Sequence, residues 1–303
     1  MTAATGTVAF VGAGNMGGAM VERLRGLGWP VAVCDTSPEA RARAQAAGAT
    51  LCDSPQAAAA TLGDEGVLVI VVVDAAQCQA VLWGEGGAAP SLRAGQCVML
   101  CPTIAPEDTE AIARRLAQQG VHTIDAPMSG GPARARAGTM SLMLAGASPV
   151  IEGHARLIAD LSNAVFRVGE RVGDGARTKL VNNLLAGINL VGAAEALALA
   201  ERLGLDPSTT LGVIERSSGQ SWIGTDRMRR ALAGDAAPLA HMTLLAKDTG
   251  LAMAAARRAG HEGVLGPRAA ATFAAALAGG MADRDDAALL DWMRAHPGGL
   301  PRP

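Results

Sequence analysis

Residues 7–20 read TVAFVGAGNMGGAM, and this stretch decides the fold expected of the chain. Residues 7–11 form a short run without polar alternation, which is typical of a parallel strand buried on both faces. Glycines at 12, 14 and 17 follow at once, and a helical pattern begins at Asn15. The stretch therefore predicts a strand, a tight turn and a helix in direct succession.

The same alternation repeats through the first 130 residues. Strands are predicted at 7–11, 31–35, 67–73, 97–100 and 122–125, and helices at 15–27, 38–47, 55–62, 77–82 and 106–119. Strand, helix and strand joined by short connections form right-handed crossovers, so an α/β fold with a doubly wound parallel sheet is expected. A strand at 140–145, a helix at 149–161 and a strand at 165–168 extend the same domain.

The character of the chain changes after Gly169. Helices are predicted at 172–203, 207–215, 239–259, 268–278 and 285–295, with no further strand. The first would be about 45 Å long at about 1.5 Å per residue, long enough to leave one domain and enter another. We therefore expect a sheet domain at 1–169 and an all-helical domain at 170–303.

Composition and charge exclude several classes of function. The 26 Lys and Arg and 28 Asp and Glu give a net charge of −2, and aromatic residues make up 2% of the chain. Neither the basic field nor the stacking surfaces of a nucleic-acid-binding protein are present. The longest strongly apolar run, 67–73, is far shorter than the roughly 20 residues of a membrane-spanning helix. We therefore expect no nucleic-acid partner and no membrane partner.

Cysteine and histidine spacing indicates the compartment and the absence of a metal. The five cysteines contain no C-x-x-C pair, and the five histidines show no metal-ligand spacing. The first residues lack the basic region of a signal peptide. A cytoplasmic protein with reduced thiols and no metal site is the expectation.

The glycine turn has the pattern of a dinucleotide-binding site. Gly12 permits the tight turn, Gly14 lets the backbone approach a pyrophosphate, and Gly17 allows the helix to pack closely on the strand. The N–H groups at the start of the helix then face the phosphates. The predicted contact set is Gly12, Ala13, Gly14, Asn15, Met16 and Gly17.

Asp35 ends the second predicted strand, 18 residues after Gly17. A carboxylate at this place can accept hydrogen bonds from the ribose hydroxyls and repels a 2′-phosphate, which favours NAD over NADP. Arg41 and Arg43 follow closely in the sequence and are positive charges that suit a 2′-phosphate, so NADP remains an alternative cofactor.

A second constellation, DAPMSGGP at 125–132, ends the last parallel strand at the edge of the sheet where open α/β folds bind ligands. The hydroxyl of Ser129 and the N–H groups of Gly130 and Gly131 can form a nest sized for a carboxylate. The segment alone is equally compatible with an ordinary turn.

The third constellation, GDGARTKLVNN at 173–183, lies at the start of the long helix. Lys179 and Asn183 are four residues apart and share a helix face. A lysine held partly out of water can exchange a proton near neutral pH, which suits a general acid or base. On spacing alone, a lysine that lies along an apolar surface with its charge in water remains an alternative.

These segments, in this order, resemble the β-hydroxyacid dehydrogenase family, which includes 3-hydroxyisobutyrate dehydrogenase and tartronate semialdehyde (2-hydroxy-3-oxopropionate) reductase. The matching motifs are FVGAGNMGGAM, DAPMSGG, GDGARTKLVNN and LLAKDTGLA at 244–252, so the resemblance covers nearly the whole chain. The family fold is an N-terminal Rossmann domain joined by a long helix to an all-helical domain.

The resemblance implies roles for individual residues. Lys179 matches the catalytic lysine that carries the proton of the substrate hydroxyl, and Asn183 matches the residue that orients this hydroxyl. Ser129, Gly130 and Gly131 match the loop that binds the substrate carboxylate. Further cofactor-binding positions implied by the family are Val72, Val73, Asp74, Thr103 and Lys247.

Two departures from the family pattern bear on the substrate. Pro102 replaces a residue that is often serine, which puts one cofactor contact in doubt. The segment VVVDAAQCQAVLWG lacks the Leu-Pro pair usual in 3-hydroxyisobutyrate dehydrogenases, and looks closer to tartronate semialdehyde reductases and threonate dehydrogenases. Trp222 is a candidate for substrate contact, although it can equally be a packing residue.

The expected activity is hydride transfer between NAD, or NADP, and a small 3-hydroxy acid that carries a carboxylate. The leading expectation is a 3-hydroxyisobutyrate dehydrogenase-like enzyme, with tartronate semialdehyde reductase or threonate-type dehydrogenase as the alternative. An imine reductase, 6-phosphogluconate dehydrogenase and a non-catalytic dinucleotide sensor fit the motifs or the length less well. The apolar helical domain predicts a homodimer or homotetramer.

Overall fold

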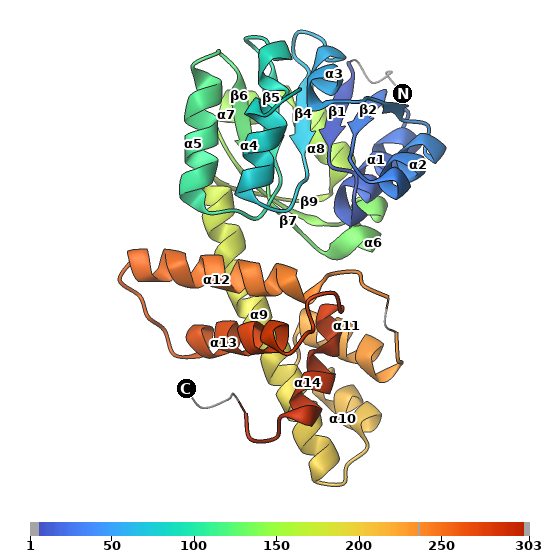
Figure 1. Ribbon diagram of the computed structural model, residues 1–303, viewed down its shortest axis with the longest axis vertical. Coiled ribbons are helices and arrows are strands. Elements are labelled where there is room, and N and C mark those ends of the chain that lie inside the picture. The colour runs from blue at the N-terminus through green and yellow to red at the C-terminus, as the bar shows by residue number, and fades with distance from the viewer. Residues whose placement is uncertain (1–5, 236, 300–303) are drawn as a thin grey trace. The chain divides into compact units, whose positions relative to one another are not determined.

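The computed structural model describes residues 6–235 and 237–299. The chain divides into two compact units, Met1–Lys179 (unit 1) and Leu180–Pro303 (unit 2), each described here by itself. Unit 1 contains one sheet (Figure 1). Its strands are β1 (Val8–Val11), β2 (Val31–Cys34), β3 (Thr50–Leu51), β4 (Val67–Ile70), β5 (Cys97–Leu100), β6 (His122–Asp125), β7 (Met128–Ser129), β8 (Ser141–Ala145) and β9 (Ala164–Gly169).

The order of the strands confirms the predicted doubly wound sheet. It runs β3-β2-β1-β4-β5-β6-β8-β7, with β9 paired to β8. The first six strands in this order are mutually parallel, while β8 is antiparallel to β6 and β7. From β1 the chain adds β2 and β3 on one side of the sheet, and then β4, β5 and β6 on the other side. The order of the strands therefore reverses between β1 and β4. At such a switch point the loops after neighbouring strands diverge and leave room for a ligand.

Helices cover both faces of the sheet (Figure 1). Inward residues alternate along each strand: Phe10 faces one core with α1 and α8, and Val11 faces the other core with α4 and α5. The helices of unit 1 are α1 (Asn15–Gly26), α2 (Pro38–Ala46), α3 (Pro55–Ala60), α4 (Ala75–Trp83), η1 (Ala89–Ser91), α5 (Pro106–Ala117), α6 (Gly131–Ala137), α7 (Ser148–Gly153) and α8 (Ala155–Leu161).

Some local predictions were wrong in detail. The helix expected at 149–161 is two helices, α7 and α8, that meet at His154. The helix α6 was not predicted, because a Gly-Gly-Pro sequence is typical of a loop. The two-residue strands β3 and β7 are too short to produce a pattern in the sequence.

The described residues of unit 2 form helices joined by turns and loops, and their only β pairing is an isolated bridge between His241 and Asp285. The long helix α9 (Asp174–Arg202) begins in unit 1 and ends in unit 2. The remaining helices are α10 (Pro207–Ile214), α11 (Trp222–Leu232), α12 (Met242–Arg258), α13 (Leu265–Ala278), η2 (Asp286–Ala288) and α14 (Leu289–Ala295). The helix α11 was not predicted, because its buried residues are few and charged residues surround them.

The core of unit 2 forms around the inner face of α9. Leu190, Ala194 and Leu197 are buried there against side chains of α12, α13 and α14. The helix is long and apolar enough, by length and composition, to cross a membrane. One such helix is weak evidence of a membrane span, and its buried residues pack in the core of unit 2.

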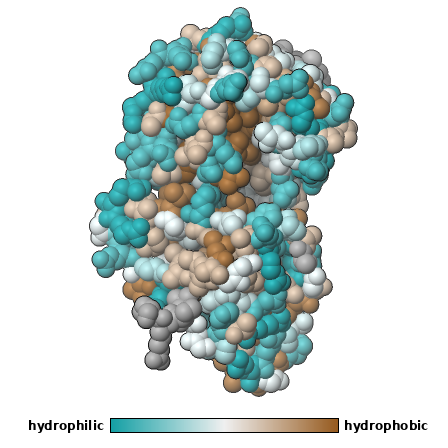
Figure 2. All heavy atoms as spheres, in the orientation of Figure 1, coloured by the Kyte–Doolittle hydropathy of each residue, from teal (hydrophilic) through white to brown (hydrophobic). Residues whose placement is uncertain are grey.

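The face of the molecule drawn in Figure 2 is mostly hydrophilic, and the cysteines are free thiols. On the face drawn in Figure 2, hydrophilic side chains predominate and hydrophobic ones gather in patches among them. All five cysteines are free and buried, at positions 34, 52, 78, 97 and 101. Burial raises the pKa of the Cys97 thiol to about 12 and also raises that of Cys101.

Candidate functional site

The predicted cofactor residues of unit 1 lie along one edge of the sheet. Parallel pairing places Val11 beside both Cys34 and Ile70, and Leu100 beside both Ile70 and Asp125. The segments that follow β1, β2, β4, β5 and β6 therefore leave the sheet at the same edge. Five stretches that are far apart in the sequence meet there as loops.

The glycine turn packs closely at Gly12 and Gly17 and is open at Gly14. Gly12 has a φ of +94°, and a Cβ built on it would lie 2.3 Å from the carbonyl oxygen of Val71. A Cβ on Gly17 would lie 2.1 Å from the carbonyl oxygen of Gly12, so these two glycines permit close packing. Nothing lies within 4 Å of a Cβ built on Gly14. The structure therefore leaves open space where a phosphate would approach the backbone, and the residues fit a dinucleotide.

The carboxylate of Asp35 is hydrogen-bonded to this turn. Its Oδ2 accepts a hydrogen bond from the N–H of Ala13 at 2.5 Å, and its Oδ1 accepts one from the N–H of Ser37 at 2.7 Å. Arg41 donates instead to the carbonyl of Cys52 at 2.8 Å and pairs with Asp53 at 2.9 Å. The carboxylate is thus held at the end of β2, whereas Arg41 contacts Cys52 and Asp53.

The loop after β4 also reaches the glycine turn. A side-chain carbon of Val72 lies 3.4 Å from the Cβ position of Gly12. Val73 is exposed, and its N–H donates to the side chain of Gln77. Asp74 caps α4 by accepting the N–H of Gln77 at 2.8 Å. Thr103, after β5, is half-buried and follows a buried Pro102.

The predicted carboxylate nest has an unusual backbone. Gly130 and Gly131 both have positive φ, +125° and +74°. A Cβ on Gly130 would meet the side chain of Arg134 at 3.0 Å, whereas the space around Gly131 is open. Ser129 ends β7 and is half-buried. Two consecutive positive φ values form a turn that residues with a Cβ rarely adopt, which explains why both positions are glycine.

Asp125 anchors the start of α9. Its Oδ2 accepts the N–H of Gly173 at 2.8 Å and that of Ala176 at 3.0 Å. The carboxylate therefore satisfies helix N–H groups that would otherwise lack partners, and its charge faces the positive end of the helix. Burial raises the pKa of Asp125 to about 6, although these backbone hydrogen bonds oppose the shift. A Cβ on Gly175 would lie 2.8 Å from this carboxylate, so only glycine allows the approach.

Lys179 and Asn183 lie one turn apart on α9, as their spacing predicts, and both are buried. A lysine that merely lies along the surface keeps its charged end in water. Because Lys179 is buried, it does not fit this surface alternative.

Within unit 2, Asn183 belongs to a chain of polar contacts. Its Nδ2 donates to Oδ2 of the buried Asp248 at 2.5 Å, and its Oδ1 accepts from the side chain of Asn182 at 2.9 Å. The other carboxylate oxygen of Asp248 lies 2.9 Å from Nζ of Lys247. The structure thus brings together Asn183 and Lys247, two predicted site residues, through a carboxylate.

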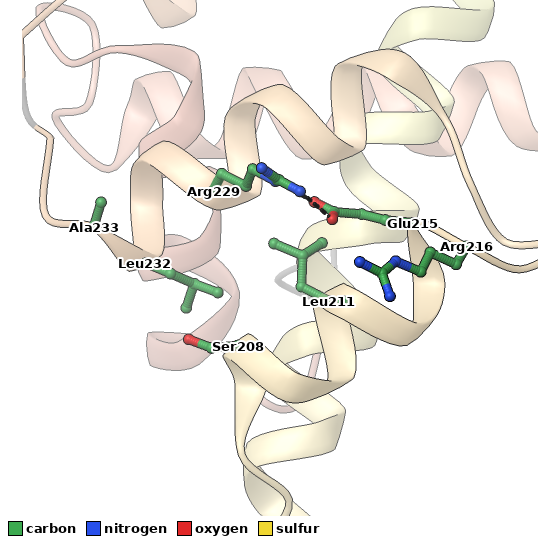
Figure 3. A pocket seen from close by; sticks show the side chains of 8 residues that line it. Ser208, Leu211, Glu215, Arg216, Arg229, Leu232 and Ala233 are labelled. Carbon is green, nitrogen blue, oxygen red and sulfur yellow. Dashed lines mark hydrogen bonds and ion pairs between the residues drawn. The ribbon is translucent and has the colours of Figure 1, made fainter.

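The remaining candidate, Trp222, begins α11 and is half exposed, at 49%. None of the predicted site residues lines the groove of about 450 Å³ formed by residues of α10 and α11 and the turn after each. Figure 3 shows an ion pair between Arg229 and Glu215 beside this groove. Leu211 and Leu232 supply its apolar lining.

Two residues with clear structural roles were not identified from the sequence. Asp125 and Asp248 were noted only as members of motifs. Each acts on a residue far along the chain, Asp125 on Gly173 and Asp248 on Asn183. For Asp125, the available signal was an aspartate at the end of a buried strand.

Sequence models of two known domains match the chain. Residues 7–169 match the NAD-binding domain of 6-phosphogluconate dehydrogenase. Residues 173–293 match the NAD-binding domain of NADP-dependent 3-hydroxyisobutyrate dehydrogenase. The two matches together span most of the chain.

Individual relatives align along nearly the full length. L-threonate dehydrogenase from Cupriavidus necator is 37% identical over 284 residues, which are 93% of this chain and 94% of that protein. 3-Hydroxyisobutyrate dehydrogenase from Pseudomonas aeruginosa is 35% identical over 262 residues, 82% and 85% of the two chains. The crystal structure of 3-hydroxyisobutyrate dehydrogenase from Salmonella typhimurium superposes with a TM-score of 0.88 at 31% identity, covering 94% of this chain and 99% of that one.

Proposed function

Because this chain belongs to the β-hydroxyacid dehydrogenase family, it is an NAD(P)-dependent oxidoreductase of small hydroxy acids, and we propose that it oxidises L-threonate with NAD. The observation that carries the substrate is the alignment with relatives named L-threonate dehydrogenase from several bacteria over 93–94% of this chain. The segment after β4, which lacks the Leu-Pro pair, supports the same choice.

In this proposal the substrate carboxylate is bound by the nest at Ser129, Gly130 and Gly131. The two positive φ values and the open space around Gly131 support this role. A carboxylate bound there fixes one end of a small acid, which leaves its hydroxyls to be placed by other groups.

Lys179 takes the proton from the substrate hydroxyl, and Asn183 holds this hydroxyl in place. Asn183 is well suited to this because Asp248 accepts from its Nδ2 and Asn182 donates to its Oδ1, which fixes both ends of its amide. The nicotinamide, when bound, accepts the hydride from the carbon that bears the hydroxyl. The protein itself positions the substrate, binds its carboxylate and supplies the one group that carries the proton.

The preference for NAD is supported by Asp35 and Arg41. The Asp35 carboxylate is fixed beside the glycine turn, where its charge opposes a 2′-phosphate. Arg41 makes its contacts with Cys52 and Asp53. Lys247 is proposed to contact the cofactor and the substrate. Thr103 and the segment Val72, Val73 and Asp74 are proposed as further cofactor contacts.

The site of action in this proposal is the cytoplasm. Five free thiols, all buried in unit 1, are compatible with a reducing compartment. No group of three or more His, Cys, Asp or Glu side chains that could hold a metal is found in the described part of the chain. The proposed chemistry needs none.

The deciding experiment is a panel of steady-state assays. kcat/KM would be measured with NAD and with NADP for L-threonate, 3-hydroxyisobutyrate, glycerate and 3-hydroxypropionate. We expect L-threonate with NAD to exceed the other acids by about tenfold or more, because a site built to pair several hydroxyls discriminates against acids that lack them.

Two outcomes would replace the proposal. If 3-hydroxyisobutyrate is oxidised as well as L-threonate or better, the second candidate, a 3-hydroxyisobutyrate dehydrogenase, is correct; the 35% identical relative favours it. If NADH binds tightly and no acid in the panel is oxidised, the chain is a dinucleotide-binding sensor.

A further inference from the structure

The first turn of α9 is held to the sheet by one buried carboxylate. Oδ2 of Asp125, the last residue of β6, accepts the N–H of Gly173 at 2.8 Å and the N–H of Ala176 at 3.0 Å. Asp125 is 2% exposed. N–H groups in the first turn of a helix have no partner within the helix, so this side chain supplies the acceptor that fixes them. The turn can move away from β6 only by breaking both hydrogen bonds.

The glycines of the GDGA sequence at 173–176 permit this contact. A Cβ on Gly175 would lie 2.8 Å from the carboxylate carbon of Asp125. A Cβ on Gly173 would lie 2.9 Å from the side chain of Arg177 and 3.0 Å from that of Glu110 in α5. Gly173 also has a φ of +103°. The two glycines therefore allow side chains of β6 and α5 to approach the backbone of the turn.

A second attachment joins the same turn to α5. Arg177 pairs with Glu110 at 2.5 Å and with Asp174 at 2.9 Å. The side chains of this ion pair are partly exposed, and exposed ion pairs contribute little to stability because water and salt screen them. Asp125 is therefore the buried part of the attachment, and its hydrogen bonds are not screened in this way.

Lys179 lies close to the anchored turn. It is three residues beyond Ala176 on the same helix, which is about 4.5 Å along the helix axis. A displacement of the first turn therefore moves Lys179 as well. On the other side of Asp125 along the chain, Ser129 begins the proposed carboxylate nest four residues later. The segment 125–131 thus carries both the nest and the acceptor that anchors the helix of Lys179.

We propose that Asp125 is a positioning residue of the reaction, which fixes the place of Lys179 relative to the nest by holding the first turn of α9. The inference rests on the proposed function, in which Lys179 carries the proton of the substrate hydroxyl. The hydrogen bonds of the Asp125 carboxylate go to the backbone of α9, so its role is exerted through Lys179.

Steady-state kinetics of Asp125 variants test this role, with L-threonate or the best acid of the panel and saturating NAD. Asp125→Ala removes the acceptor, and we expect kcat to fall by about tenfold or more, because a misplacement of about 1 Å can cost about 10² in rate. KM for the acid should change by less than about threefold, since a group needed in the transition state acts on kcat. Asp125→Asn keeps an acceptor oxygen and should retain kcat within about threefold.

Gly175→Ala reaches the same turn by another route, which also decides the question if Asp125→Ala does not fold. The carboxylate stays, but the new Cβ would lie 2.8 Å from it and displace the turn. Alanine is otherwise the better helix former, so a merely structural role of the turn gives no reason for a loss of activity. We expect the same fall in kcat as for Asp125→Ala.

Gln96→Ala is the matched control. Gln96 is fully buried in unit 1, and its side chain makes two hydrogen bonds to backbone groups, with Gly63 and Arg93, at 2.8 Å each. It precedes β5 and so lies at the opposite edge of the sheet from the loops after the strands. This variant should be destabilised and should keep the wild-type kcat.

Hydrogen–deuterium exchange, followed by mass spectrometry on the full chain, reads the anchor without any turnover. In peptides that cover residues 170–183, Asp125→Ala and Gly175→Ala should exchange faster than the wild type by about tenfold or more, because hydrogen bonds to a charged acceptor are lost. Gln96→Ala should leave these peptides unchanged. NADH should bind all variants with nearly the Kd of the wild type.

Three results would overturn the proposal: wild-type kcat in a folded Asp125→Ala or Gly175→Ala variant, unchanged exchange at 170–183 in both, or a loss of NADH binding that accompanies the loss of kcat. Circular dichroism would show which variants are folded. Failure of the proposed function looks different, because Lys179→Ala would then keep its turnover or no acid of the panel would be oxidised. The exchange result decides whether Asp125 holds the turn in either case.

Discussion

Asn183 and Asp248 lie 65 residues apart in the sequence and share a buried hydrogen bond of 2.5 Å, from the amide of Asn183 to the carboxylate of Asp248. The carboxylate also pairs with Lys247, and Asn182 holds the other end of the amide. Asp248 is therefore a positioning residue in the proposed mechanism, since it sets the orientation of a side chain that holds the substrate.

We expect Asp248→Asn to lower kcat by about tenfold or more, because a hydrogen bond to a charged partner contributes about 1.5–3 kcal/mol. Stopped-flow and steady-state assays with the best acid of the panel would measure this. The control is Asp291→Asn, an exposed carboxylate in ion pairs with Arg284 and Arg294. An equal loss in both variants would contradict a positioning role.

Lys179→Ala should reduce turnover by about 10² or more while NADH still binds with nearly its original Kd, because the lysine is proposed to carry a proton and not to hold the cofactor. Turnover and a fluorescence titration with NADH would be measured on the same preparation. Arg202→Ala, an exposed cation at the end of α9, serves as the control. Retention of more than a few per cent of the wild-type rate would rule out the role.

We expect Gly14→Ala to weaken NADH binding and Gly12→Ala to lower the free energy of unfolding. Gly14 has open space around it and a negative φ, so alanine there should leave the free energy of unfolding within about 1 kcal/mol yet weaken NADH binding tenfold or more. Gly12→Ala should be destabilised, because its Cβ would collide with the carbonyl of Val71. Gly63→Ala, with equally open surroundings, is the control. Unchanged NADH affinity in Gly14→Ala would mean that the turn does not hold the pyrophosphate.

Asp35→Asn should move the ratio of kcat/KM for NAD to that for NADP toward NADP by about tenfold or more. The amide keeps an acceptor for a backbone N–H but no longer repels a 2′-phosphate. Asp64→Asn, an exposed carboxylate of the same unit, should leave the ratio unchanged. A wild type that already prefers NADP would contradict the interpretation of Asp35.

Asp125 should make stability depend on pH. Its folded pKa, about 6, lies above its ordinary value of 3.8, so the folded state holds the proton more tightly than the unfolded chain. This contribution is fully present below pH 3.8 and is lost as the pH rises through about 6. Relative to Asp125→Asn, the wild type should therefore gain about 2 kcal/mol in the free energy of unfolding between pH 7.5 and pH 4.5. Urea unfolding at both values checks this, and a difference that does not change with pH would contradict it.

Much of the fold could be predicted from short-range patterns. Aliphatic runs predicted β5 and β6 to the residue, and the glycine turn predicted where α1 begins. Spacing alone placed Lys179 and Asn183 on one face of α9. The contacts that join distant segments could not be obtained in this way, because no local pattern shows that Asp248 reaches Asn183 or that Asp125 reaches Gly173. The helix α11 escaped prediction because tertiary packing of Gly224 and Met228 stabilises it more than its composition does.

The five buried thiols can report when unit 1 opens, because a reagent reaches them only in an opened state. All of them are buried within residues 34–101 of unit 1, and the sequence of unit 2 contains no cysteine. Burial raises the pKa of Cys34, Cys52, Cys97 and Cys101, which disfavours their reactive thiolate form, and Cys78 is buried as well. The rate at which a maleimide labels the cysteines would therefore measure how often unit 1 opens. Opening of unit 2 would not contribute to the labelling, because that unit has no cysteine.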